Sequence, residues 1–294
     1  MPAPLDRLLG GAPRHPSRIV CLTEEPTETL YRLGAGDRVV GVSGYTVRPK
    51  EARAKPKVSA FIEADVDAIL ALRPDLVVGF SDLQADIAAT LVRRGAAVLL
   101  FNQRSVAEIL QMVHVLAGVV GLAPAGERLA GELEANLRRH AQAAQALPRR
   151  PRVFFEEWHA PLIAGIRWCS ELIEIAGGED VCAEKRACGL AKDRIVDPAE
   201  IARRDPEVVI ASWCGRKVLE ARIRARPGWS AVAAVRADQL YEIKSTYILQ
   251  PGPAALSDGL DQLAAIVHAA AGGEHLPRPR PGLPRQAPMA PRYA

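Results

Sequence analysis

The sequence predicts an α/β protein with two lobes, each a parallel sheet flanked by helices, joined by one long helix. The chain nearly repeats itself: the first copy spans 18–78 and the second spans 152–209. The interval from the opening Arg to the last Pro is 74 − 18 = 56 residues in one copy and 206 − 152 = 54 in the other. A repeat of this length is a whole lobe, because solenoid units are shorter.

Strands and helices alternate along the first copy, which is typical of a parallel sheet covered on both faces. β-branched apolar runs predict strands at 18–22, 39–43, 76–80 and 97–101. Helical spacing predicts helices at 27–33, 65–72 and 83–94, the first ended by Gly34 and the second opened by an acidic cap.

The pattern changes between the copies, where 106–121 is helical and 125–146 forms a 22-residue run with Leu129, Leu133 and Leu137 on one face. We expect this run to be a stiff connector that permits only modest lobe motion. The expected divisions are an N-terminal extension at 1–17, a lobe at 18–104, connecting helices at 105–148, a lobe at 149–272 and a disordered Pro/Arg-rich tail at 273–294.

Composition indicates an ordinary globular protein. The 294 residues are 49% hydrophobic and 24% charged, and a net charge of +4 spread among 34 acids leaves no nucleic-acid footprint. Five cysteines without a C-x-x-C pair argue against a disulfide framework or a zinc ribbon. No run has the length of a membrane span. Residues 1–18 lack an apolar stretch of secretion-signal length, so we expect a cytoplasmic protein, or a periplasmic one if the N-terminus is truncated.

Several segments carry a resemblance to a known family. They are Arg18-Ile19-Val20, the run from Leu33-Gly34 to Ser43, Lys55-Pro56-Lys57-Val58, and Ile69 to Val78 with its P-D-L-V-V element. The chain resembles the helical-backbone (class III) substrate-binding proteins of ABC importers, in particular the cobalamin- and ferric-siderophore-binding branch. The resemblance covers about 18–272 and implies two Rossmann-like lobes joined by a backbone helix, with a small ligand captured in the cleft between them.

Ligands of open α/β sheets bind outside the carboxyl ends of the strands, so the residues that follow each strand are the candidate site. In the first lobe these are Thr23, Glu24, Glu25, Tyr45, Phe80, Ser81 and Asp82. In the second lobe they are Trp158, His159, Trp168 in the next loop, Trp213, Cys214 and Tyr247. Aligning the copies pairs Glu24 with Trp158 and Glu25 with His159.

Three of the four tryptophans fall at or beside these strand ends, although aromatic residues are only 5% of the chain. Indole rings suit a planar macrocycle with polar groups on its rim, which favours cobalamin, another corrinoid, haem or a related metal chelate as the ligand. The alternative is that Trp158 and Trp213 only fill the top of the second sheet. No cofactor is required by this reading.

Two side chains of the second lobe could bind a metal centre. His159 could be an axial ligand through a neutral ring nitrogen, or an ordinary hydrogen-bonding residue, and Cys214 is a softer candidate. Glu24 and Glu25 could receive a cationic or metal-bearing ligand, or favour the N-terminus of the next helix. No nucleophile elbow, Walker loop or H-E-x-x-H occurs. An enzyme or metal-handling protein that uses Glu24, Glu25 and His159 stays the alternative to a binding protein.

The resemblance also implies a partner. Relatives dock permease arginines through acidic residues on each lobe. The second lobe here instead has a basic run, which a solvated helix face or an anionic partner would also explain, and which would repel permease arginines. An ABC permease is therefore left open as a partner. The run contains Arg216, Lys217, Arg222, Arg224 and Arg226.

Overall fold

The computed structural model describes residues 14–277, which divide into two compact units. The first unit contains the described residues up to 103 together with 111–130, and the second contains 104–110 and the residues from 131 onward. The two connecting helices, α5 (Val106–Val119) and α6 (Ala123–Ala144), are therefore shared between the units. The predicted extension at 1–17 and tail at 273–294 lie mostly outside the described residues.

The first unit is built on a six-stranded sheet with the order β4-β3-β2-β1-β5-β6. All neighbouring strands are parallel except the β3–β4 pair. The strands are β1 (Ile19–Cys21), β2 (Val39–Ser43), β3 (Lys57–Ala60), β4 (Glu63–Ala64), β5 (Leu76–Phe80) and β6 (Val98–Phe101). The sequence prediction missed β3 and β4, because β4 has only two residues and β3 mixes a lysine and a serine with two small apolar residues.

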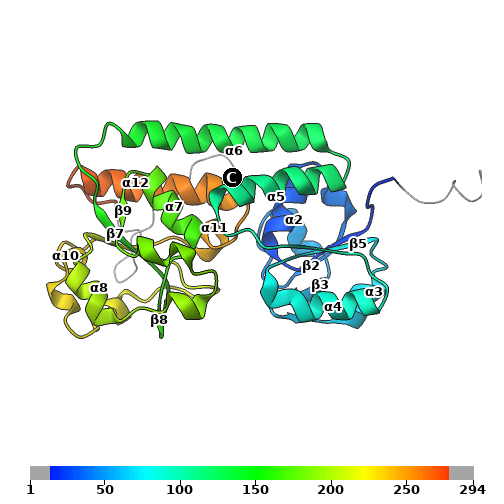
Figure 1. The fold of residues 1–294 in the computed structure, drawn as a ribbon, viewed down its shortest axis with the longest axis horizontal. Coiled ribbons are helices and arrows are strands. Elements are labelled where there is room, and N and C mark those ends of the chain that lie inside the picture. Colours follow the sequence, from blue (N-terminus) through cyan, green and yellow to red (C-terminus); the bar gives the residue numbers. More distant parts are fainter. Residues whose placement is uncertain (1–13, 278–294) are drawn as a thin grey trace, which may run out of the picture. The chain divides into compact units, whose positions relative to one another are not determined.

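Helices cover both faces of this sheet: α3 and α4 lie on one side and α2 on the other (Figure 1). The helices are α2 (Glu24–Arg32), α3 (Val66–Ala71) and α4 (Ala85–Arg93), with 3-10 turns at Gly36–Arg38, Lys50–Ala54 and Asp82–Gln84. Val20 and Val77 of the sheet pack with Ile69 of α3 and Leu91 of α4. The predicted helix at 27–33 thus begins three residues earlier, which places Glu24 and Glu25 in its first turn.

The second unit has the strand order β11-β10-β7-β8, with β9 also paired to β7. β7 is parallel to β10 and β9, whereas β8 folds back antiparallel to it. The strands are β7 (Arg152–His159), β8 (Leu162–Ala164), β9 (Glu179–Asp180), β10 (Val208–Ala211) and β11 (Leu240–Glu242).

The second unit is also layered, and Phe154 of β7 packs on one face with Ile201, Ile223 and Trp229. Its helices are α7 (Arg167–Ile175), α8 (Pro198–Arg204), α9 (Glu220–Arg224), α10 (Ala233–Arg236), α11 (Ser245–Ile248) and α12 (Leu260–Ala271). Shorter turns occupy Ala183–Ala187, Ala191–Arg194 and Trp229–Ala231, and a π-helical turn occupies Ala255–Gly259. Both units are α/β layers around a largely parallel sheet, as the sequence predicts.

The repeated arginine forms the same kind of hydrogen bond in both units. The Arg18 guanidinium donates to the Leu72 carbonyl at 2.6 Å, at the end of α3, and the Arg152 guanidinium donates to the Asp205 carbonyl at 2.8 Å, at the end of α8. Each arginine thus satisfies a carbonyl that a helix C-terminus leaves unpaired. The visible sequence repeat is therefore scaffold.

The repeated Pro-Asp and Pro-Glu pairs are scaffold as well. The Asp75 carboxylate accepts from the Arg18 backbone N–H at 2.9 Å, and the Glu207 carboxylate accepts from the Arg152 backbone N–H at 2.9 Å. In both units the acid satisfies the N–H that opens the central strand. The residue before each proline, Arg73 or Asp205, has a positive φ of 50° or 47°.

α6 is a 22-residue helix, as expected, with its bounds two residues earlier than predicted. Its C-terminal part is fixed within the second unit by hydrogen bonds of Asn136 to the Leu256 carbonyl at 3.0 Å and of His140 to Asp261 at 2.7 Å. None of the helices within residues 14–277 has the length and apolar character that crossing a membrane requires.

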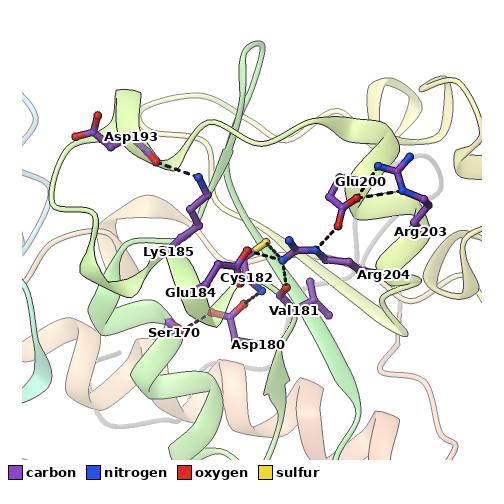
Figure 2. A network of polar contacts seen from close by, with 10 residues as sticks. All are labelled: Ser170, Asp180, Val181, Cys182, Glu184, Lys185, Asp193, Glu200, Arg203 and Arg204. Atoms are coloured by element: carbon purple, nitrogen blue, oxygen red, sulfur yellow. Dashed lines mark hydrogen bonds and ion pairs between the residues drawn. The ribbon is translucent and has the colours of Figure 1, made fainter.

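A polar network in the second unit ties the segment after β9 to α8 (Figure 2). Arg204 of α8 donates to the Val181 carbonyl at 2.5 Å and pairs with Glu184 at 2.6 Å and Glu200 at 3.0 Å. The Cys182 thiol lies within this network and is buried, as are those of Cys21 and Cys169, whereas Cys214 is exposed. The network joins this segment to α8 through hydrogen bonds and ion pairs, and Cys182 forms no disulfide.

Candidate functional site

The first-unit candidates lie at one edge of its sheet. β2, β1 and β5 are adjacent and parallel, so the residues after them meet at the carboxyl edge. Glu24 and Glu25 follow β1, Tyr45 follows β2, and Ser81 follows β5. The predicted set in this unit is therefore brought to a common edge.

The acid at the centre of this edge, Glu25, is buried, and no cation among the described residues pairs with it. Glu25 is 2% exposed, its Oε1 accepts from the Thr23 hydroxyl at 2.7 Å, and its Oε2 has no hydrogen-bond partner among the described residues. A buried carboxylate without a counter-ion is costly, so the group holds its proton instead. Burial, with a smaller effect of the Glu24 charge, raises the pKa of Glu25 to about 8.

Glu24 behaves in the same way, since burial raises its pKa to about 7. Both side chains sit in the first turn of α2, where the helix dipole favours an anion but does not offset the loss of water. Near neutral pH this edge therefore presents carboxylic acids that are at least partly protonated. Such groups donate hydrogen bonds as well as accept them.

The other first-unit candidates differ in accessibility. Tyr45 is 54% exposed, whereas Phe80 and Ser81 are buried. The Phe80 N–H donates to Gln84 Oε1 at 3.0 Å. Ser81 has φ 79° and ψ 157°, a conformation that only glycine adopts without strain, and its hydroxyl accepts from the Leu83 N–H at 3.2 Å. Strain of this kind is concentrated at functional sites. Asp82 opens the turn that follows.

The second-unit candidates also share a sheet edge, because β11, β10 and β7 are adjacent and parallel. Trp158 and His159 end β7, Trp213 and Cys214 follow β10, and Tyr247 lies in α11 after β11. The expected loop position of Trp168 is wrong. It lies in the first turn of α7, where it is buried and its indole N–H donates to the Ile248 carbonyl at 2.8 Å.

Three rings form a continuous aromatic cluster at this edge. His159 stacks on Trp213 with centroids 4.3 Å apart and planes at 23°, and Trp158 meets His159 edge-on at 5.2 Å. Trp213 is buried, whereas Trp158 and His159 are partly exposed. The Arg216 guanidinium lies 5.5 Å from the Trp158 ring, within cation–π range. The two outer rings are therefore the accessible part of the cluster.

Sequence reasoning missed the pair that supports this cluster. Glu156 is fully buried on β7, receives two hydrogen bonds from Arg226 at 2.6 and 2.7 Å, and accepts from the Trp213 indole N–H at 2.9 Å. Arg226 in turn stacks 4.4 Å over Trp229. Glu156 thus fixes the orientation of the indole on which His159 rests. The available signal was an acid inside an apolar strand, which indicates a buried partner.

The basic run is less cationic than its sequence suggests. Arg226 is neutralised by Glu156, and Arg224 pairs with Glu220 at 2.5 Å and also with Asp238. Among the described residues, no carboxylate pairs with Arg216, Lys217 or Arg222. The Arg222 guanidinium instead contacts His159 Nε2 at 2.5 Å. Burial and the nearby arginines lower the pKa of His159, so its ring is neutral at pH 7.

The predicted alignment of Glu24 with Trp158 and of Glu25 with His159 pairs residues of different elements, since the acids lie in α2 and the two rings lie in β7. β1 ends at Cys21 and a helix starts at Glu24, whereas β7 continues to His159 in a hairpin with β8. The acids thus belong to the first unit and the imidazole to the second. Residues 14–277 contain no group of three or more His, Cys, Asp or Glu side chains that could hold a metal ion.

Comparison with known proteins gives the family. The profile described as "Periplasmic binding protein" matches residues 19–247. An uncharacterized ABC transporter substrate-binding lipoprotein of Bacillus subtilis is 24% identical over 264 residues, covering 87% of this chain and 81% of the relative. A vitamin B12-binding protein of Vibrio parahaemolyticus is 26% identical over 243 residues, covering 82% of this chain and 86% of the relative.

Solved structures share the fold. A periplasmic haem-binding protein of Roseiflexus sp. RS-1 is similar with a TM-score of 0.74 and 24% sequence identity. The match covers 87% of this chain and 99% of the Roseiflexus chain. The periplasmic vitamin B12-binding protein of Vibrio cholerae has a TM-score of 0.70 at 22% identity, covering 88% and 99%.

These findings correct one expectation and support another. The expected cytoplasmic location is wrong, because the matching proteins are periplasmic or lipoprotein components of importers. The expected class, a protein that binds a small ligand, agrees with a match that covers most of the chain. The chain belongs to the periplasmic binding protein family, whose members here include substrate-binding proteins of ABC transporters.

Proposed function

We propose that this protein captures a corrinoid or a related metal tetrapyrrole and delivers it to an ABC permease. The observation that carries the proposal is the cluster of Trp158, His159 and Trp213 at the carboxyl edge of the second sheet. Flat rings at a sheet edge suit a flat macrocycle. Similar proteins are described as binding vitamin B12 or haem, which supports the same ligand class.

Each sheet edge, taken by itself, carries groups that suit the rim of such a ligand. Free guanidinium groups beside the rings can bind carboxylates or phosphate, and the partly protonated acids of the first unit can donate to carbonyl groups. Tyr45 adds an exposed ring at the first edge.

The permease partner is also part of this proposal. The sequence suggested a strongly basic second lobe that would repel docking arginines, but Arg224 and Arg226 are neutralised within the unit. Among the described residues, Arg216, Lys217 and Arg222 of the run have no carboxylate partner, and two of them lie at the ligand edge: Arg216 beside Trp158 and Arg222 beside His159. The main objection to a permease is therefore weakened.

Isothermal titration calorimetry with cyanocobalamin, cobinamide and haemin tests the proposal directly. We expect saturable binding of at least one of them, and we expect protein purified from a producing culture to have the colour of a bound corrin or porphyrin. No heat with any of the three at high micromolar concentration would refute the ligand class.

A further inference from the structure

The contact between Arg222 and His159 determines where the proton of the imidazole ring lies. Arg222 Nη1 is 2.5 Å from His159 Nε2. A guanidinium group only donates hydrogen bonds, so Nε2 must be the acceptor. The neutral ring therefore keeps its proton on Nδ1, which is buried and has no hydrogen-bond partner among the described residues. The nitrogen with the free electron pair is the one that Arg222 occupies.

The Arg222 guanidinium could bind an anionic group more strongly than it binds His159. Its side chain is exposed, and within residues 14–277 its guanidinium forms no ion pair with a carboxylate. The neighbouring Arg224 and Arg226 both have carboxylate partners. A carboxylate binds a guanidinium more strongly than a neutral imidazole does, because the hydrogen bonds are then assisted by both charges. An anionic group brought to this edge would draw Arg222 away from His159.

We propose that Arg222 covers the metal-binding nitrogen of His159 in the ligand-free protein, and that a metal chelate with free carboxylates uncovers it. The inference rests on the proposed tetrapyrrole ligand and narrows it to chelates with anionic side groups. The hydrogen bond from Arg222 to Nε2 breaks and hydrogen bonds from Arg222 to the carboxylate form. The Nε2 electron pair then binds the metal, a metal-bound water leaves, and the ring keeps its Nδ1 proton.

The ligand-free protein tests the covering contact. Nitrogen-15 NMR of histidine rings distinguishes a proton on Nδ1 from a proton on Nε2. We expect the Nδ1–H form for His159 in the wild-type protein and a substantial Nε2–H population in Arg222→Ala. Arg203→Ala, which removes an exposed arginine paired with Glu200, should leave the tautomer unchanged. A wild-type ring with its proton on Nε2 would overturn the covering contact.

Haemin and haemin dimethyl ester test the uncovering step, because the two differ only in their free carboxylates. We expect an imidazole-coordinated absorption spectrum for wild-type protein with haemin but not with the ester. Arg222→Ala should give the coordinated spectrum with the ester too. It should bind the ester about tenfold more tightly than the wild-type protein does, because no hydrogen bond to Nε2 has to be broken. His159→Ala should abolish the coordinated spectrum with both ligands.

Two outcomes contradict the uncovering step. Wild-type protein that coordinates the ester as readily as haemin shows that the carboxylates are not needed, and an Arg222→Ala variant that treats the ester as wild type does shows that Arg222 does not cover Nε2. Wild-type protein that binds neither porphyrin nor any corrinoid refutes the proposed function and the uncovering step together. The tautomer measurement then still decides the covering contact.

Discussion

The two sheet edges each bury an acid, and burial raises the pKa of both, but only the second edge gives its acid a charged partner. Glu25 of the first unit has a hydroxyl as its hydrogen-bond partner and holds its proton, whereas Glu156 of the second unit has the Arg226 guanidinium and the Trp213 indole N–H. At the first edge, the buried Glu25 is therefore largely protonated and uncharged near pH 7. The second is an ion pair that supports a stack of rings. One scaffold thus produces two chemically different surfaces.

The largest expected effect comes from breaking the paired acid. Glu156→Ala leaves Arg226 buried without its carboxylate, so we expect it to lower the free energy of unfolding by about 3–5 kcal/mol. Urea denaturation followed by circular dichroism measures the change. Glu200→Ala, which removes solvent-exposed ion pairs with Arg203 and Arg204, should have a much smaller effect and serves as the control.

The same experiment can separate the unpaired charge from lost packing. The double substitution Glu156→Leu with Arg226→Met removes both charges and should recover much of the stability lost by Glu156→Ala. If Glu156→Ala were as mild as Glu200→Ala, the buried pair would not be the support of this edge, and the contrast between the two units would be incorrect.

The next effect concerns ligand binding at the second edge. Trp158→Ala removes an accessible ring and should weaken binding of a tetrapyrrole by about 1–3 kcal/mol, or up to about a hundredfold in dissociation constant. Calorimetry with the ligand that binds best measures it. Trp158→Phe keeps an aromatic ring and should retain most of the affinity. Equal binding by all three proteins would remove Trp158 from the site.

The scaffold could be predicted well because its signals are local. The α6 run, the strand at 39–43 and the strand at 76–80 each have a clear period, and the structure reproduces them within two residues. The repeated Arg and Pro positions were visible for the same reason. They satisfy strand and helix ends, which every copy of the scaffold must do.

The support of the site could not be predicted in this way. Arg226 lies 70 residues from Glu156 in sequence, and nothing local distinguishes it from Arg222 or Arg224. Which arginine finds a carboxylate depends on the path of the chain after β10. The prediction for Trp168 was wrong for a related reason. The sequence alone does not distinguish a tryptophan that faces outward at a strand end from one that packs beneath the sheet edge.

A smaller effect, with the opposite sign, is expected for the unpaired acid. The pKa of Glu25 rises from 4.5 to about 8, so the unfolded chain releases this proton at lower pH than the folded protein does. The contribution of Glu25 is therefore complete below about pH 4.5 and is lost as the pH rises toward 8. Glu25→Gln, which mimics the protonated acid, should therefore be more stable than the wild-type protein at pH 8.

Urea denaturation of Glu25→Gln and the wild type at pH 4 and pH 8 checks this sign. The two proteins should be nearly equal at pH 4 and diverge at pH 8. Thr23→Val, which removes the hydroxyl donor, should raise the pKa further and enlarge the loss at pH 8. A Glu25→Gln variant that is less stable than wild type at pH 8 would mean that Glu25 is ionised and has a cationic partner, like Glu156.

The smallest expected effect tests what the two units have in common. Asp75 accepts hydrogen bonds from the Ser17 and Arg18 backbone N–H groups, and Glu207 accepts from the Arg152 N–H, so both acids satisfy the start of a central strand. Asp75→Ala and Glu207→Ala should each lower the free energy of unfolding by about 1 kcal/mol, the usual net contribution of such hydrogen bonds. Urea denaturation measures both losses, and similar values would mean that the two acids have the same structural role. A loss of several kcal/mol for one substitution and none for the other would mean that the repeated Pro-acid pair has different roles in the two units. Neither substitution should alter tetrapyrrole binding, because both acids lie where the strands begin and the site residues lie where the strands end.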